Sequence, residues 1–244
     1  MSPEVLDTLG RAMHGVGWVF FLVLLLPLLY LFAPSLRGLK PLVETIISTI
    51  DTLNYHIGET VKWGLVLLVL SVAMSVFALS IFGLSWTKLS ESAEYFHASV
   101  LILGASATLL ASQHVRVDIF HSQMSAKSKA LVDFIGFYAL LLPVCLIILW
   151  NSQSFIYFSW LIFEGSSESD GIRGEFLLKS LIPAFSVLMI SQGFAIALRA
   201  AMCLHGQNRP QRPEHTPPLY RGSEHVQALQ SATQSQSLKT EPSR

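Results

Sequence analysis

The residues best suited to chemistry lie in one short charged turn. Arg116 and Asp118 follow a run from Tyr95 to Val115 that contains no Asp, Glu, Lys or Arg, and His114 lies at the end of that run. An arginine and an aspartate two residues apart can pair where an apolar helix ends. The turn therefore predicts either an ion-paired corner that also docks a partner, or an ordinary solvated turn.

Catalytic and cofactor-binding patterns are missing from the sequence. It contains no nucleophile elbow, phosphate-binding glycine loop, His-Glu zinc motif or catalytic dyad. A haem is disfavoured, because His97 and His114 lie about 25 Å apart on one helix at about 1.5 Å per residue. The apolar runs 63–87, 134–163 and 180–198 offer no partner histidine. We therefore expect no enzyme activity, no cofactor and no metal.

The composition is that of an integral membrane protein. Apolar residues make up 52% of the 244 residues and charged residues only 13%, where soluble domains carry roughly 25%. Basic and acidic residues balance at 16 each, so no net charge favours a nucleic acid partner. Cys145 and Cys203 have neither metal-ligand nor redox spacing and are interpreted as packing residues.

Two regions precede the predicted transmembrane core. Residues 1–35 predict an uncleaved N-terminal membrane anchor helix, kinked at Pro27. Residues 36–62 predict an amphipathic helix in the membrane interface. Its expected apolar side holds Leu42, Val43, Ile46, Ile47, Ile50 and Leu53, and its expected polar side holds Glu44, Ser48 and Asp51.

Residues 63–204 predict a four-helix transmembrane core, which makes the fold class an all-α integral membrane protein. The expected crossings are Trp63–Thr87, Tyr95–Ser112, Phe134–Phe163 and Ser180–Leu198. We expect the stretch 86–120 to organise the others. The third run is long, so we expect a kink at Pro143, an exit at Asn151–Ser154, and residues 155–160 along the surface. Residues 205–244 predict a disordered cytoplasmic tail.

Small residues on the second crossing predict a helix-packing or partner interface. Gly104 and Thr108 lie on one helical line, and Ala107 and Ala111 lie on the next. Small residues four apart allow a second membrane helix to approach closely.

Basic and acidic residues predict the orientation in the bilayer. Arg116, Lys127 and Lys129 in one turn, with Arg199, Arg209 and Arg212 after the last crossing, indicate the cytoplasmic side. The acidic loop from Glu164 to Glu175 is then outside, and the C-terminus is cytoplasmic. We expect Lys179 to be an interface anchor and Pro183 a tolerated first-turn proline.

The expected crossings hold almost no ionisable group at depth. Lys62, Glu94, Asp133, Lys179 and Arg199 all lie close to a helix end, whereas carriers keep such groups inside. This favours a structural membrane subunit. Two alternatives remain open: a membrane-anchor subunit of a redox complex, and a stand-alone channel or carrier.

An ordered set of motifs resembles one membrane protein family. The run Leu109-Leu110-Ala111-Ser112-Gln113-His114-Val115-Arg116-Val117-Asp118 is similar to the hallmark of the DctQ-type small permease subunit of TRAP (tripartite ATP-independent periplasmic) transporters. Further matches are Ala130-Leu131-Val132-Asp133, Ser159-Trp160, Glu164-x-Ser166, Asp170-Gly171, Lys179-Ser180-Leu181-Ile182-Pro183 and Gln192-Gly193. Ser75–Ser80 departs from the family by lacking an arginine, and Gly171-Ile172-Arg173-Gly174 replaces its usual turn.

The resemblance implies a place in a three-part uptake system of the bacterial inner membrane. A large DctM-like permease subunit would carry the substrate and sodium sites, and a periplasmic DctP-like binding protein would deliver an organic acid. The small subunit would act as a scaffold for the large one and help to dock the binding protein. The lipid bilayer is its other expected partner.

Overall fold

The computed structural model describes residues 23–32, 38–111 and 124–206 of the chain. The corner motif His114, Arg116 and Asp118 lies outside the described residues, as do most of the predicted anchor and nearly all of the predicted tail. The described elements are the helices α2 (Leu26–Phe32), α3 (Lys40–Val61), α4 (Trp63–Phe82), α5 (Thr87–Leu110), α7 (Ala126–Gly136), η2 (Phe137–Leu141), α8 (Leu142–Leu161) and α9 (Glu175–Leu204).

The predicted fold class is confirmed. The described residues form helices and no strand. Four helical stretches among them are long and apolar enough to cross a membrane, and these are Lys40–Phe82, Thr87–Leu110, Lys127–Leu161 and Glu175–Leu204.

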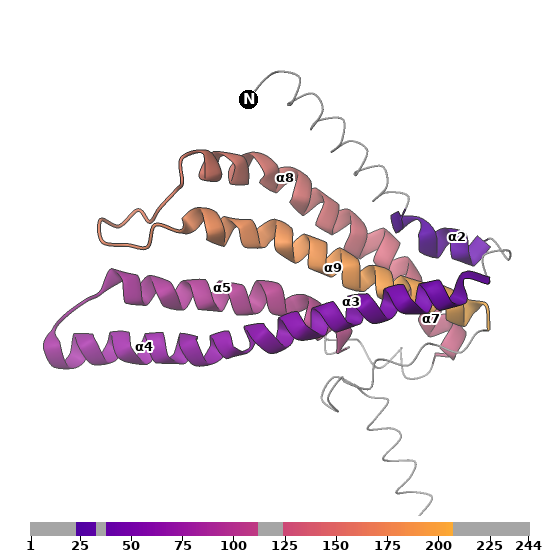
Figure 1. Cartoon of the computed structure of the whole chain (residues 1–244), viewed down its shortest axis with the longest axis horizontal. Helices are drawn as coiled ribbons and strands as arrows, with labels where there is room; N and C mark the ends of the chain where they lie inside the picture. Colours follow the sequence, from indigo (N-terminus) through magenta and orange to yellow (C-terminus); the bar gives the residue numbers. More distant parts are fainter. Residues whose placement is uncertain (1–22, 33–37, 112–123, 207–244) are drawn as a thin grey trace, which may run out of the picture.

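Helix α9 lies at the centre of the bundle. It packs against α8 on one side and against α5 and α3 on the other, while α4 packs on α5 (Figure 1). In the apolar 18-residue window of α9, 44% of the residues are buried, against 11–17% in the corresponding windows of the other three stretches. Its buried residues are largely small, including Gly193, Ala195, Ala197 and Ala201, which allows neighbours to approach. The expectation that the stretch 86–120 organises the bundle is therefore wrong.

Helix α3 continues into α4 almost without a break. Lys62 between them has helical dihedral angles, so the two helices form a stretch of 43 residues. At about 1.5 Å per residue this stretch is about 64 Å long, roughly twice the apolar thickness of a bilayer. The interfacial location of α3 stays a prediction.

The buried face of α3 differs from the expected one. Val43, Ile47, Asp51, Asn54 and Gly58 are buried, whereas Leu42 and Leu53 are more than half exposed. The prediction that Asp51 lies on the polar side with Glu44 and Ser48 is wrong, because Asp51 is fully buried against α9.

Helices α7, η2 and α8 form one continuous rod. Pro143 cannot donate a backbone hydrogen bond, and a π-helical segment just before it, Phe137–Leu141, accommodates its ring. The helix then continues through Asn151, whose side chain donates to the Ile147 carbonyl at 2.8 Å. The helix therefore does not end at Asn151–Ser154 but continues to Leu161, and the exit from the bilayer at Asn151–Ser154 stays a prediction.

The hydrophobic core lies at the α7 end of the bundle, where α2, α3, α7 and η2 meet α9. Tyr138 donates to the Leu24 carbonyl at 2.7 Å, and a ring nitrogen of His205 lies 2.9 Å from the Tyr30 carbonyl. The His205 contact ties α2 to the C-terminal end of α9, and the Tyr138 contact ties the residues before α2 to η2. The opposite end, called here the loop end, contains the connections 83–86 and 162–174.

Candidate functional site

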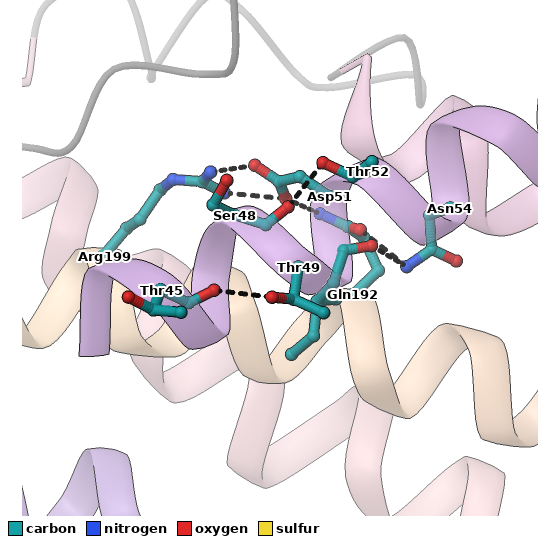
Figure 2. A network of polar contacts seen from close by, with 9 residues as sticks. Thr45, Ser48, Thr49, Asp51, Thr52, Asn54, Gln192 and Arg199 are labelled. Carbon is teal, nitrogen blue, oxygen red and sulfur yellow. Dashed lines mark hydrogen bonds and ion pairs between the residues drawn. The ribbon is translucent and has the colours of Figure 1, made fainter. Parts of the chain in front are cut away.

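Two clusters of polar side chains lie toward opposite ends of α9. The first, called here the α3–α9 network, consists of Asp51 and Asn54 from α3 and Gln192 and Arg199 from α9 (Figure 2). Residues three apart and seven apart share a helix face, so each helix presents its pair to the other. The spacing of each pair along its helix thus brings the four side chains to the contact between α3 and α9.

The Asp51 carboxylate is the centre of the α3–α9 network. Arg199 donates Nη1 to Oδ1 at 3.3 Å and Nη2 to Oδ2. Gln192 donates Nε2 to Oδ1 at 3.1 Å, and its Oε1 accepts from Asn54 Nδ2 at 2.9 Å. Figure 2 shows Arg199 and Gln192 both reaching across to α3. The carboxylate therefore accepts from three donors.

The side chains of the α3–α9 ion pair are almost completely shielded from solvent. The side chain of Asp51 is 0% exposed and that of Arg199 13%. Removing one partner of such a pair leaves an uncompensated buried charge, which costs about 3–5 kcal/mol. Asn54 Oδ1 and Arg199 Nε are buried without a partner among the described residues. The pair is closed, so the network can fix two helices but has no free carboxylate for cargo.

The sequence analysis missed this network. It placed Arg199 close to a helix end and Asp51 on a polar face, and it expected almost no ionisable group at depth in the crossings. The available signal was that Asp51 continues the line of Val43 and Ile47 at four-residue spacing. Gln192, near the middle of the most buried helix, was the second signal.

The second cluster, at the loop end, is centred on Glu91 of α5. One carboxylate oxygen of Glu91 accepts from the Ser166 hydroxyl, and the other accepts from the Ile172 backbone N–H at 2.5 Å. We call these three residues the Glu91 latch. It connects the start of α5 to both arms of the 162–174 loop.

Lys179 ties the same loop to α9. It pairs with Glu164 and its Nζ lies 4.2 Å from the centre of the Phe155 ring. The hydrogen bond from Lys179 lowers the pKa of the Glu164 carboxyl below its ordinary value. Trp160 donates its indole N–H to the Ser180 hydroxyl at 2.8 Å, so α8 and α9 are joined beside the ion pair.

The structure brings together the loop residues that the sequence singled out. Ser166 contacts Glu91, Glu164 contacts Lys179, and Asp170 pairs with Lys88 of α5 at 2.9 Å. Ser159 is buried. Gly171 lies so close to Ser166 and Glu91 that a Cβ there would be 2.6 Å from Glu91 Oε1. The functional role of these residues stays a prediction.

Pro183 and Lys179 do not lie at the start of α9. The helix begins at Glu175, so Lys179 is in its second turn and Pro183 is in its interior. The interpretation of Pro183 as a first-turn proline is therefore wrong. The acidic loop is shorter than expected because Glu175 is already helical.

The four small residues of α5 differ in how deeply they are buried. Ala107 and Ala111 are buried, whereas Thr108 is exposed and donates to the Ala105 carbonyl at 2.7 Å. Gly104 is half-buried, and a Cβ at that position would meet nothing within 4 Å. A partner interface at these four positions stays a prediction. In the described part of the chain, no three His, Cys, Asp or Glu residues could hold a metal ion.

Comparison with known families gives one match. The family model described as tripartite ATP-independent periplasmic transporters, DctQ component, matches residues 68–203. No curated protein and no solved structure matches the chain. The matched residues include most of α4, the whole Glu91 latch, and Gln192 and Arg199 of the α3–α9 network. They exclude all of α3.

Proposed function

Because the chain belongs to the DctQ component family of the tripartite ATP-independent periplasmic transporters, we propose that it is a scaffold for a large DctM-like permease subunit. The assembled system takes up organic acids, typically carboxylates, at the expense of a sodium gradient. The chain itself is a multi-pass protein of the bacterial inner membrane and the small membrane subunit of its transporter.

The closed state of the α3–α9 network is the observation that supports a scaffold role. A subunit that carries ions or solutes needs ionisable or polar groups that can bind and release cargo at depth. Here both carboxylate oxygens of Asp51 already accept hydrogen bonds, which come from Arg199 and Gln192. This arrangement favours a rigid partner of a transporting chain over a carrier.

The outer faces of α4 and α8 support a role in assembly. Large apolar side chains cover them, and among these Val69, Phe77, Ile147 and Trp150 are more than half exposed. Lipid and a partner helix are both suitable neighbours for such faces. Within the described residues of α4, only Ser71 and Ala78 are buried, which leaves most of the helix available for the large subunit.

We further propose that the loop end faces the periplasm and helps to dock the DctP-like binding protein. The α7 end and the C-terminus are then cytoplasmic. Lys40, Lys127, Lys129 and Arg199 lie toward the α7 end, against Lys88, Arg173 and Lys179 at the loop end. Lys88 and Lys179 are paired with Asp170 and Glu164, and the small excess of basic residues toward the α7 end supports this orientation.

Reconstitution tests this function. The chain is co-expressed with a DctM-like large subunit, purified through a tag on the chain, and placed in proteoliposomes with a soluble DctP-like binding protein. We expect co-purification, and uptake of a carboxylate that needs a sodium gradient and all three components. Uptake by liposomes that contain this chain alone would contradict the scaffold role.

A further inference from the structure

We propose that Glu91 is a positioning residue that holds the 162–174 loop in the conformation that docks the soluble binding protein. The inference rests on the proposed function, since it takes docking at the loop end as given. It adds which side chain prepares the docking surface and what kind of contact that surface accepts.

Glu91 is placed to control the whole loop. Its two carboxylate oxygens accept from residues on opposite arms, Ser166 on the outgoing arm and Ile172 on the returning arm. The arms also bond directly, from Ser166 N–H to the Ile172 carbonyl at 3.1 Å. One carboxylate therefore closes the loop and attaches it to α5 at the same time.

The other contacts between the loop and α5 are weaker. Lys88 and Asp170 pair at 2.9 Å, but their side chains are 62% and 70% exposed, and exposed pairs contribute little. Glu164 and Lys179 attach the start of the loop to α9, not to α5. Tyr95 of α5 also lies against Gly174 at the end of the loop. Among the hydrogen bonds and ion pairs that join the loop to α5, those of Glu91 are less exposed to solvent than the pair of Lys88 and Asp170.

The latch also shapes a cavity in the loop. A cavity of about 320 Å³ is lined by residues that include Ser166, Glu168, Gly171 and Arg173. Two of these, Ser166 and Gly171, lie directly against the Glu91 carboxylate. Movement of Glu91 therefore changes a wall of the cavity.

The lining of the cavity indicates the contact that it accepts. Glu168 and Arg173 provide one charge of each sign, and Ser166 and Ser169 provide hydroxyls. Such a lining fits a polar, hydrogen-bonding segment of the binding protein and not an apolar side chain. Holding the loop in its bound conformation before docking reduces the entropy lost on association.

The start of the loop is held by the end of α8 and not by the latch. Phe163 has a φ of 46°, a left-handed conformation that commonly ends a helix. The Glu164 N–H donates to the Ser159 carbonyl at 3.0 Å across it, and the ring of Phe163 packs edge-on against Phe176. The latch is therefore needed only for the part of the loop that follows Glu164.

The test uses the complete three-component complex with Glu91→Ala and Glu91→Gln. The matched control is Glu94→Ala, an exposed carboxylate one turn further along α5. Three quantities are measured: co-purification of the large subunit, hydrogen exchange of residues 164–174, and the affinity of the soluble binding protein. For Glu91→Ala we expect normal co-purification, faster exchange in the loop and about tenfold weaker binding. Glu91→Gln keeps one acceptor oxygen. Its loop exchange rate and its affinity for the binding protein are expected to lie between those of Glu91→Ala and those of the unaltered chain.

The outcomes separate this inference from the proposed function. If the unaltered complex does not bind the soluble protein, the proposed docking role is wrong. If it binds and Glu91→Ala loosens the loop without weakening binding, the positioning role of Glu91 is wrong. Unchanged exchange in Glu91→Ala also overturns it. Should Glu91→Ala fail to assemble, Ser166→Ala removes one latch contact together with the acceptor of the Glu168 N–H, and equal binding by that variant and the unaltered complex counts against the inference.

Discussion

The α3–α9 network and the Glu91 latch use the same chemistry in opposite surroundings. In each, one carboxylate accepts from two or three donors that belong to distant parts of the chain. Asp51 is fully buried between two helices, whereas Glu91 is half-buried at the edge of a loop. The comparison teaches that the surroundings decide the role. A buried carboxylate fixes how helices pack, and a partly exposed one sets the position of a loop.

Arg199→Ala is expected to have the largest effect, because it leaves Asp51 charged and buried without a cation. We expect a loss of about 3–5 kcal/mol in the free energy of unfolding, measured by denaturation of the purified subunit in detergent. Arg173→Ala, at an exposed arginine of the loop, is the control and should be close to neutral.

The double variant Asp51→Leu with Arg199→Met sharpens this prediction. It replaces the pair by apolar side chains and is expected to be more stable than Arg199→Ala. A double variant as unstable as the single one would show that the charges are not the reason for the loss.

Gln192→Leu is expected to have the second largest effect. The change removes one donor to Asp51 and the acceptor of Asn54 Nδ2, but it leaves the ion pair with Arg199. Asn54 Nδ2 still donates to the Ile50 carbonyl and Asp51 Oδ1 still accepts from Arg199, so the expected loss is that of two buried hydrogen bonds, together about 1–3 kcal/mol. The same denaturation measurement checks it, with Gln153→Leu on exposed α8 surface as control. A loss larger than that of Arg199→Ala would mean that hydrogen bonding, and not charge, dominates the network.

The sequence predicted the helices better than their faces. Long uncharged runs located the crossings, because apolar length alone decides whether a helix can span a bilayer. The face of α3 was predicted wrongly because Asp51 was assigned by its charge to the polar side, which is correct for most unpaired aspartates. Its partner Arg199 is 148 residues away, and no local pattern reports a contact of that kind.

At the loop end, too, the sequence analysis identified some of the residues but missed the contact that joins them. The resemblance singled out Ser166, Gly171 and Lys179, which the structure brings into one cluster. The sequence analysis did not single out Glu91, because its partners are a hydroxyl and a backbone N–H about 80 residues away in sequence. A backbone donor has no signature in the sequence, so this contact needed the fold.

The ion pair of Glu164 and Lys179 gives a prediction that depends on pH. Lys179 lowers the pKa of the Glu164 carboxyl from its ordinary value of 4.5. The stabilisation is therefore complete above that ordinary value and is lost as the pH falls through the lowered one. We expect hydrogen exchange in residues 162–174, corrected for intrinsic rates, to be unchanged between neutral pH and 4.5 and to rise below it. Lys179→Met should raise exchange at neutral pH and remove the pH-dependent step, whereas a step that persists would assign it to another carboxylate.

Asp170→Asn is expected to have the smallest effect. It tests whether the energetic contribution of a contact is limited by its exposure to solvent rather than by its position in the loop. Asp170 lies in the same loop as Ser166 and pairs with Lys88 from the same helix as Glu91, but both its side chain and that of Lys88 are largely exposed. Water screens such a pair, so the free energy of unfolding should change by less than about 1 kcal/mol. Binding of the soluble protein should also change far less than in Glu91→Ala. If Asp170→Asn weakened binding as much as Glu91→Ala does, Asp170 itself would contact the partner, and the distinction between a residue that positions the loop and one that binds would have to be redrawn at this helix.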